Sequence, residues 1–190
     1  MIPKIETCFF LMEQYSMLSN IKDHSLTVAR VAHLIAREIN ALGFELSIPK
    51  VTAGALLHDI GKTACLKSGK DHAEMGKQIC IENNLHEISQ LVAEHVRLKN
   101  YRLNSGYSEK EIVFYSDKRV NHDKIVSVDD RLAYILERYG RNQKQIHDGI
   151  KKNFELCLQV EKKLFKKLDF HSSHLSILAK DEDIYYDPPL

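Results

Sequence analysis

Apolar residues recur at helical spacing along most of this chain, and no segment shows the strict apolar–polar alternation of a half-buried strand. In the segment 20–41, for example, Ile21, Val28, Val31 and Ile35 form one stripe. The chain has 190 residues, 44% of them hydrophobic, so it can bury a core without disulfides or a structural metal. The sequence therefore predicts an all-α fold, a single-domain helical bundle spanning residues 1–190.

Capping residues and glycines set the helix boundaries. Ser47 precedes a proline, Asp71 can cap a helix, and Ser108 with Glu111 fits a capping box. Residues 63–69 and 99–107 are expected to be loops that form pocket walls, and the acidic segment 181–190 is expected to pack loosely. Helices are predicted over 4–18, about 20–41, from Ser47 until shortly before Gly61, from Asp71 onward, about 85–98, from Ser108 onward, 127–140 and about 142–168.

Charge and cysteine content exclude several classes of protein. The net charge of +1 argues against a protein that binds double-stranded nucleic acid by broad electrostatic attraction. No apolar run approaches a membrane span, and the N-terminus lacks the basic and apolar regions of a signal peptide. The four cysteines, none in a C-x-x-C pair, indicate neither a zinc knuckle nor a disulfide framework. We therefore expect a cytoplasmic protein with no membrane partner, and the oligomeric state stays open.

A run of small and apolar residues, from Ala53 to Leu57, leads directly into His58 and Asp59. An imidazole and a carboxylate at the end of a buried helix are costly to desolvate without a partner. A divalent metal ion would remove that cost, because neutral histidine and ionised aspartate are both good ligands. A buried, hydrogen-bonded histidine beside a helix-capping aspartate explains the pair equally well, so further ligands must decide.

Helical phase indicates which other histidines point inward. At about 100° per residue, His24 lies within about 60° of the apolar stripe of its helix, whereas His33 lies about 180° from His24 and is expected to face solvent. His95 continues a buried stripe, and His86 lies on roughly the opposite face. His72 opens a helix, whose N-terminus disfavours imidazolium and keeps the ring able to bind a metal.

Asp117 follows Val113 by four residues and precedes Val120 by three, which turns it inward. Each of these groups alone is explained as a hydrogen-bonded core residue, but a small helical core seldom buries six of them without a common partner. The expected cofactor is one or two divalent transition-metal ions, from among iron, manganese, nickel, cobalt and zinc. The groups sort into two metal sites that share one carboxylate: His24, His58, Asp59 and Asp117, and then Asp59, His72 and His95.

Five stretches resemble, in this order, motifs of the HD superfamily of metal-dependent phosphohydrolases, in the branch with His-Asp-Ile-Gly. The ordered set is far more specific than a His-Asp pair alone. The resemblance covers about residues 18–140, so that 141–190 would be a long C-terminal helix and tail outside the family core. The stretches are Asp23-His24-Ser25-x-x-Val28-Ala29, Leu56-Leu57-His58-Asp59-Ile60-Gly61-Lys62, His72-Ala73-Glu74-Met75-Gly76, Glu94-His95 and Tyr115-Ser116-Asp117-Lys118.

This resemblance implies an all-α bundle that hydrolyses nucleotides or other phosphate esters. The six-ligand pattern is shared with dinuclear members of the family, among them diadenosine tetraphosphate hydrolases and cyclic-di-GMP phosphodiesterases. Two departures argue against cyclic-di-GMP as the substrate. The paired histidines with a following glutamate are reduced to Glu94-His95-Val96, and Gly106-Tyr107 is followed by Ser108 instead of proline.

We therefore expect a hydrolase that cleaves a phosphate ester or phosphoanhydride of a nucleotide-like small molecule through a metal-activated water. Asp59 and Lys62 are the candidate catalytic residues. Lys62 follows His58 by one helical turn and could neutralise a phosphoryl oxygen in the transition state. The alternative for Lys62 is an exposed lysine after a helix end.

Several basic residues near Asp117 are candidates for binding phosphate or assisting the leaving group, although a solvated helix face explains each of them as well. Arg119 is preferred, because a guanidinium can bind phosphate through two donors. His122 could protonate a leaving oxygen. The candidates are Lys118, Arg119, His122, Lys124 and Arg131.

Two other functions stay open. One is a dinuclear iron oxygenase, since the fold resembles that of the inositol oxygenases and the same ligand set can bind iron. The other is a non-catalytic module that binds nucleotides. The sequence does not choose the metal, because sites of mixed histidine and carboxylate ligands accept several metals.

Overall fold

The computed structural model describes residues 1–66, 68–140 and 143–185, and these residues confirm the predicted all-α fold. One short antiparallel hairpin, β1 (Val120–Asn121) with β2 (Lys124–Ile125), lies between α7 and α8. A single turn of 3₁₀ helix, η1 (Ser172–His174), precedes the last α-helix. The helices are α1 (Ile5–Gln14), α2 (Ser19–Ala41), α3 (Ile48–Leu57), α4 (Lys62–Cys65), α5 (His72–Glu82), α6 (His86–Glu94), α7 (Glu109–Asp117), α8 (Val128–Tyr139), α9 (Lys144–Leu164) and α10 (Leu175–Leu178).

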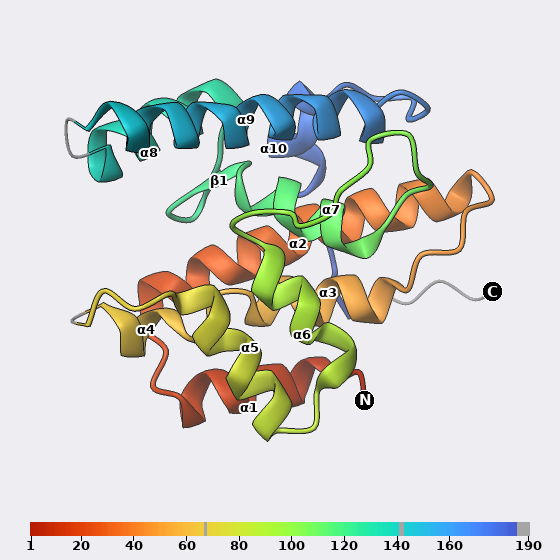
Figure 1. Ribbon diagram of the computed structural model, residues 1–190. Coiled ribbons are helices and arrows are strands. Elements are labelled where there is room, and N and C mark those ends of the chain that lie inside the picture. Colours follow the sequence, from red (N-terminus) through yellow and green to blue (C-terminus); the bar gives the residue numbers. More distant parts are fainter. Residues whose placement is uncertain (67, 141–142, 186–190) are drawn as a thin grey trace.

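The long helix α2 runs through the middle of the fold and packs against α3 and α7 (Figure 1). α3 also contacts α1 and α6, and α6 contacts α5. α8 and α9 lie together at the top of Figure 1, where α9 rests on α7. Helices α1 to α7 and the α8–α9 pair are therefore joined mainly through α7 and the hairpin.

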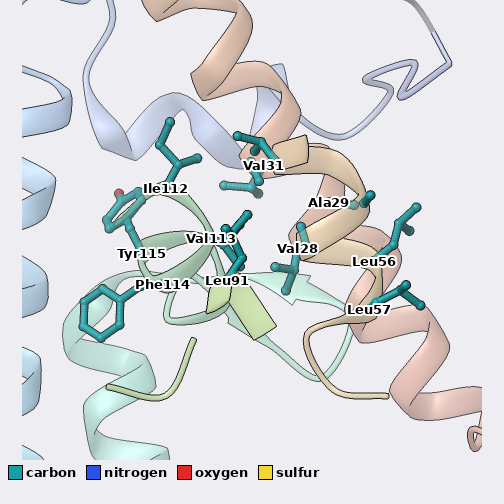
Figure 2. Close-up of a cluster of buried hydrophobic side chains, with 14 of the residues drawn as sticks. Val28, Ala29, Val31, Leu56, Leu57, Leu91, Ile112, Val113, Phe114 and Tyr115 are labelled. Atoms are coloured by element: carbon teal, nitrogen blue, oxygen red, sulfur yellow. The ribbon is translucent and has the colours of Figure 1, made fainter. Parts of the chain in front are cut away.

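Apolar side chains from α2, α3, α6 and α7 meet in one core. Figure 2 shows part of it, where Val28, Leu57, Leu91 and Val113 converge from these four helices. Each fully buried side chain of this kind contributes about 1.5–3 kcal/mol to folding. The core thereby fixes the relative positions of the helix ends that carry the candidate ligands.

The predicted helix starts are confirmed in detail. The Ser47 hydroxyl accepts a hydrogen bond from the backbone N–H of Lys50, and the Asp71 carboxylate accepts from those of Ala73 and Glu74. The predicted capping box at the start of α7 is present in both directions. Each cap satisfies backbone donors that the first helical turn leaves without a partner.

The structure differs from the predicted elements in several places. The hairpin of β1 and β2 was not expected, because two-residue strands are too short to show alternation. The predicted loop 63–69 begins within the short helix α4. Three helices end about four residues earlier than predicted: α1 at Gln14, α6 at Glu94 and α9 at Leu164. Residue 67 and residues 141–142 lie outside the described residues.

The tail prediction is wrong for residues 181–185. Glu182 and Ile184 are buried, and Glu182 accepts a hydrogen bond of 2.6 Å from the Arg37 guanidinium of α2. The pairing of Glu182 with a charged group on the core helix offsets the cost of burying its carboxylate. Residues 186–190, which the same prediction covered, lie outside the described residues.

The prediction that His33 faces solvent is also wrong, because its side chain is only 1% exposed. Its Nδ1 lies 3.1 Å from the Thr52 hydroxyl of α3, and its Nε2 lies 3.7 Å from Glu182. α2 is covered on more than one face, so an apolar stripe did not mark its only buried side. His86 is exposed, as predicted. None of the described helices combines the length and apolarity that crossing a membrane requires.

Candidate metal centre

Helix ends bring the candidate ligands together from five parts of the chain. His58 and His95 follow directly on the last residues of α3 and α6, and Asp117 is the last residue of α7. His72 is the first residue of α5, and His24 projects from the second turn of α2. The four histidine side chains lie close to the Asp59 carboxylate, and Asp117 lies close to His24 and His58.

The first group of ligand atoms surrounds one oxygen of Asp59. The Oδ2 atom lies 3.4 Å from His58 Nε2 and 4.0 Å from His24 Nε2. Asp117 Oδ1 lies 3.1 Å from His24 Nε2 and 3.7 Å from His58 Nε2. These four residues form the first of the two predicted groups.

The second group surrounds the other oxygen of the same carboxylate. Asp59 Oδ1 lies 3.3 Å from His72 Nε2 and 3.6 Å from His95 Nε2, and the two imidazole nitrogens are 3.2 Å apart. Within the described residues, two sets have ligand atoms that all lie close enough together to share an ion: His24, His58 and Asp59, and Asp59, His72 and His95. Asp117 lies beside the first set, close to its two imidazoles. The two oxygens of the Asp59 carboxylate thus face separate sets of imidazole nitrogens.

Backbone carbonyls orient three of the four rings. Nδ1 of His58 donates to the carbonyl of Ala55 at 2.7 Å, and Nδ1 of His95 donates to that of Val92 at 2.6 Å. Nδ1 of His24 donates to the carbonyl of His122 at 2.8 Å. A proton held on Nδ1 leaves Nε2 with its lone pair toward the centre, as in metal-binding histidines.

The atoms at the centre fit a divalent metal. Within the described residues, His58 Nε2 and Asp59 Oδ1 are buried and have no hydrogen-bond partner, which is costly unless another group satisfies them. Burial would raise the pKa of the Asp59 carboxyl, but His58 and the other nearby histidines hold it well below its usual value. Lys118 and His24 likewise outweigh burial and lower the pKa of Asp117. Ionised carboxylates with neutral imidazoles suit divalent transition metals.

The metal-free protein should be most stable near pH 6.5, the usual pKa of histidine. Burial lowers the pKa of His95 to about 4, so its contribution to stability is complete above about pH 6.5 and is lost as the pH falls toward 4. Burial also acts to lower the pKa of His58, but Asp59 outweighs it and raises the pKa. The contribution of His58 is therefore complete below about pH 6.5 and is lost as the pH rises through the raised value.

Urea unfolding in EDTA across this pH range measures the effect. The Asp59 and Asp117 carboxyls have lowered pKa values, so their contributions are lost only below about pH 3.9, outside the window of His95. His95→Leu should flatten the acid side of the profile, whereas His86→Ala, on the exposed face, should not. If the metal-free protein instead became more stable as the pH fell from about 6.5 to 4, the prediction that burial keeps His95 neutral would be wrong.

A cavity of about 600 Å³ opens beside the candidate ligands, and Asp59, His72, His95 and Asp117 line it. Cys65 contributes from the segment predicted as a loop. Among the described residues, no lining residue comes from 99–107, so the expected contribution of that loop is wrong. The facing wall comes from α8 and α9, through Arg131, Ile135, Tyr139, Ile146, Ile150 and Phe154.

Two of the predicted substrate-binding residues lie in this cavity. Lys62 Nζ lies 2.6 Å from Asp59 Oδ2, and the attraction of Asp59 outweighs burial and raises the pKa of Lys62. Lys118 is buried, donates to the His95 carbonyl at 2.7 Å and lies 3.3 Å from Asp117 Oδ2. Lys118 thus connects ligands of both groups.

The prediction that Arg119 binds phosphate is wrong. Its guanidinium is buried and points away from the cavity, where it donates to the carbonyls of Val126 and Ser172, to the Tyr115 hydroxyl and to Glu161 of α9. With these four acceptors, Arg119 joins α7 to the C-terminal helices. A sequence pattern cannot show this, because the partners lie up to 53 residues away.

The His122 side chain does not line the cavity either. Its ring is exposed and packs against Tyr134 at 5.3 Å, so the predicted role as proton donor is contradicted. Its backbone carbonyl instead orients His24 from a left-handed turn with φ of 55°. Arg131, the more distant of the basic candidates, does line the cavity and donates to Asn121 at 3.0 Å.

Comparison with known proteins agrees with this geometry. The HD domain family model matches residues 21–135, which is more than half of the chain. An uncharacterized protein of Methanocaldococcus jannaschii is 29% identical over 150 residues, which cover 72% of this chain and 88% of that protein. No solved structure matches the chain significantly.

Two further relatives are much longer than this chain. Ribonuclease Y of Treponema denticola is 45% identical over 60 residues, which cover 32% of this chain and 11% of that protein. The tRNA (cytidine(56)-2'-O)-methyltransferase of Picrophilus torridus is 28% identical over 197 residues, which cover 96% of this chain and 49% of that protein. The chain therefore spans less than half of the length of either protein.

Proposed function

Because the chain belongs to the HD domain family, we propose that it is a metal-dependent hydrolase that cleaves a phosphate ester or phosphoanhydride of a nucleotide-like substrate. The observation that carries this proposal is the Asp59 carboxylate, whose two oxygens face separate sets of imidazoles at the edge of a cavity. Basic side chains line the same cavity, as an anionic substrate requires: Lys62, Lys70, Arg97, Lys118 and Arg131.

The chain's own residues would divide the work as follows. His24, His58, Asp59 and Asp117 would hold one ion, and Asp59, His72 and His95 a second. Bound metal would supply a water of lowered pKa and a Lewis acid for phosphoryl oxygens.

Lys62 and Arg131 would bind the phosphoryl group. The charge of Lys62 is fixed beside Asp59 and can stabilise negative charge that develops on a phosphoryl oxygen. Arg131, held by Asn121, can donate to a second oxygen. Neither residue has to move a proton in this scheme.

The similarity to ribonuclease Y supports hydrolysis at phosphorus, because a ribonuclease, by its name, cleaves phosphate esters of RNA. RNA and nucleotides share the phosphate ester and the planar base. The broader class, a nucleotide-like phosphate ester, covers both kinds of substrate.

A direct test combines metal analysis with a substrate screen. Bound metal is quantified, and phosphate release is measured from nucleotides, dinucleoside polyphosphates and phosphomonoesters, and cleavage from short RNA, with added manganese, iron or nickel. Release of product that depends on metal supports the proposal. Oxygen consumption without hydrolysis would indicate an oxygenase, and nucleotide binding without any turnover would indicate a binding module; either result would overturn it.

Replacing Lys62 by methionine should lower kcat/KM about 100-fold while the metal content stays that of the wild type. Loss of one charge aimed at the transition state costs about 2.7 kcal/mol, or two powers of ten in rate. The matched control is Lys77→Met, because Lys77 also pairs with a carboxylate three residues away, at 3.2 Å, but lies outside the cavity lining. An unchanged rate in the Lys62 variant would remove this residue from the catalytic set.

A further inference from the structure

The wall of the cavity that faces the candidate ligands comes largely from residues outside the family match. The match ends at residue 135, whereas Tyr139 and several residues of α9 line the cavity. Ile146 and Ile150 are one helical turn apart, so they lie on one face of α9. Residues outside the match to the HD domain model therefore shape much of the space in which a substrate would lie.

Gly149 sits on that face, in the interior of α9. Glycine is the least favourable residue in a helix interior after proline, so a mid-helix glycine needs a reason. Apart from its chain neighbours and the nearby backbone of α9 itself, no atom lies within 4 Å of the position that a Cβ would take, and its φ is not in the left-handed region. Neither packing nor backbone conformation requires this glycine, but it leaves a flat strip of helix backbone open to the cavity.

An aromatic ring and two side-chain amides lie around this strip. Tyr139 is 48% exposed and close enough to Lys62 to act on its pKa, which places the ring at the cavity beside the candidate metal centre. Asn153 is held by a hydrogen bond of 2.9 Å to the carbonyl of Val96. Gln145 makes no side-chain hydrogen bond within the described part of the chain, so its donor and acceptor are available to a ligand.

We propose that the strip of α9 formed by Ile146, Gly149 and Ile150, together with Tyr139, is the subsite for the planar ring of a nucleotide-like substrate. A flat apolar surface beside an exposed aromatic ring suits stacking, which tolerates any nucleobase because each has a π-face. The Gln145 amide would meet the polar edge of the ring. Gly149 is then the residue that keeps room for the ring.

The charges around the cavity agree with this orientation of the substrate. Lys70 and Arg97 lie two residues from His72 and His95, respectively, and their side chains make no hydrogen bond or ion pair within the described residues. Phosphate groups would therefore lie at the ligand side of the cavity and the ring at the α9 side. This inference rests on the proposed function only for the placement of the phosphate groups beside the candidate ligands.

The test compares binding of ligands that differ only in the base. Isothermal titration calorimetry is run with the four nucleoside 5′-monophosphates and with ribose 5-phosphate, on the full chain with and without manganese. We expect at least one monophosphate to bind about tenfold more tightly than ribose 5-phosphate, the size of effect that base stacking gives. Gly149→Leu should abolish this preference, so that the monophosphate and ribose 5-phosphate bind about equally, because the new side chain fills the strip.

Two further variants separate this effect from damage to the helix. Gln159→Leu introduces the same side chain at an exposed position of α9 outside the cavity lining, and should keep the preference. Gly149→Ala should unfold at no lower temperature than the wild type, because the added Cβ meets no atom within 4 Å and alanine favours the helix.

Three results would overturn the inference. The first is equal binding of ribose 5-phosphate and all four monophosphates, and the second is a preference that survives Gly149→Leu. The third is binding of hexyl phosphate as tight as that of the nucleotides, because the strip would then be apolar without selecting planar rings. Because the titration without manganese measures binding apart from metal-dependent turnover, a protein that prefers nucleotides through α9 yet hydrolyses no phosphate ester would contradict the proposed function alone.

Discussion

Replacing Asp59 by alanine should abolish metal binding and turnover together. The two oxygens of this carboxylate face the two sets of imidazoles, at 3.4 Å from His58 Nε2 on one side and 3.3 Å from His72 Nε2 on the other. One substitution thus removes a ligand from both predicted sites and leaves the positive charge of Lys62 without its partner. Turnover should fall by about a thousandfold or more, since metal binding supplies several kcal/mol of transition-state stabilisation.

Metal content per chain and kcat/KM are measured on the same preparations, together with the circular dichroism spectrum as a check on folding. The spectrum should keep its helical form, because the side chain lies at a helix end and not within the apolar core. His86→Ala is the control, because His86 is exposed and outside the site, and should change neither metal nor rate. His33→Ala cannot serve, since His33 is buried. Full activity in the Asp59 variant would end the hydrolase proposal.

Removing the imidazole of His72 should give a metal content between those of the wild type and the Asp59 variant. His72 belongs to the second group of ligands and not to the first, so its loss should weaken binding of one ion and leave binding of the other unchanged. Asp59 is the residue at which both are lost. The contrast between the two variants tests the shared carboxylate, which a single-ion site does not require.

Helical phase and motif order predict the candidate site well because they act locally. Each of the six side chains lies at a helix end or on an apolar stripe, so its direction follows from positions a few residues away. His24 and Asp117 are 93 residues apart in sequence and have atoms 3.1 Å apart, yet each could be assigned an inward direction separately. The distances themselves required the tertiary structure.

The errors come from partners that are distant in the sequence. His33 is buried by Thr52 and by Glu182, which is 149 residues away, and no periodicity within α2 could show that cover. Arg119 donates hydrogen bonds to Glu161 and Ser172 and not to a phosphate, and these partners are likewise too distant in the sequence for a local pattern to show them. The α8–α9 wall of the cavity and the carbonyl of His122 that orients His24 are likewise contacts between distant segments.

Gly61→Ala should destabilise the fold by about 2–3 kcal/mol, the upper part of the range for overpacking. Gly61 has φ of −80° and ψ of −9°, which other residues adopt, so the glycine is not needed for its backbone conformation. It is needed for space: an added Cβ would lie 2.6 Å from the His72 carbonyl oxygen and 2.7 Å from the Gly76 backbone nitrogen. These are backbone atoms, which cannot turn aside as a flexible side chain can.

The same contact ties the Gly61 variant to the second metal group. The glycine of the His-Asp-Ile-Gly stretch lies against the first turn of α5 and Gly76, so the clash should push His72 away from Asp59 Oδ1. We expect affinity for the second ion to fall about tenfold or more, as for changes that misplace a metal ligand. Denaturant unfolding and metal titration measure the two effects.

Gly106→Ala, whose Cβ meets nothing within 4 Å, should change stability by no more than about 0.5 kcal/mol. If Gly61→Ala matched this control in both measurements, close packing of α5 on the His-Asp corner would not be what holds His72 in place.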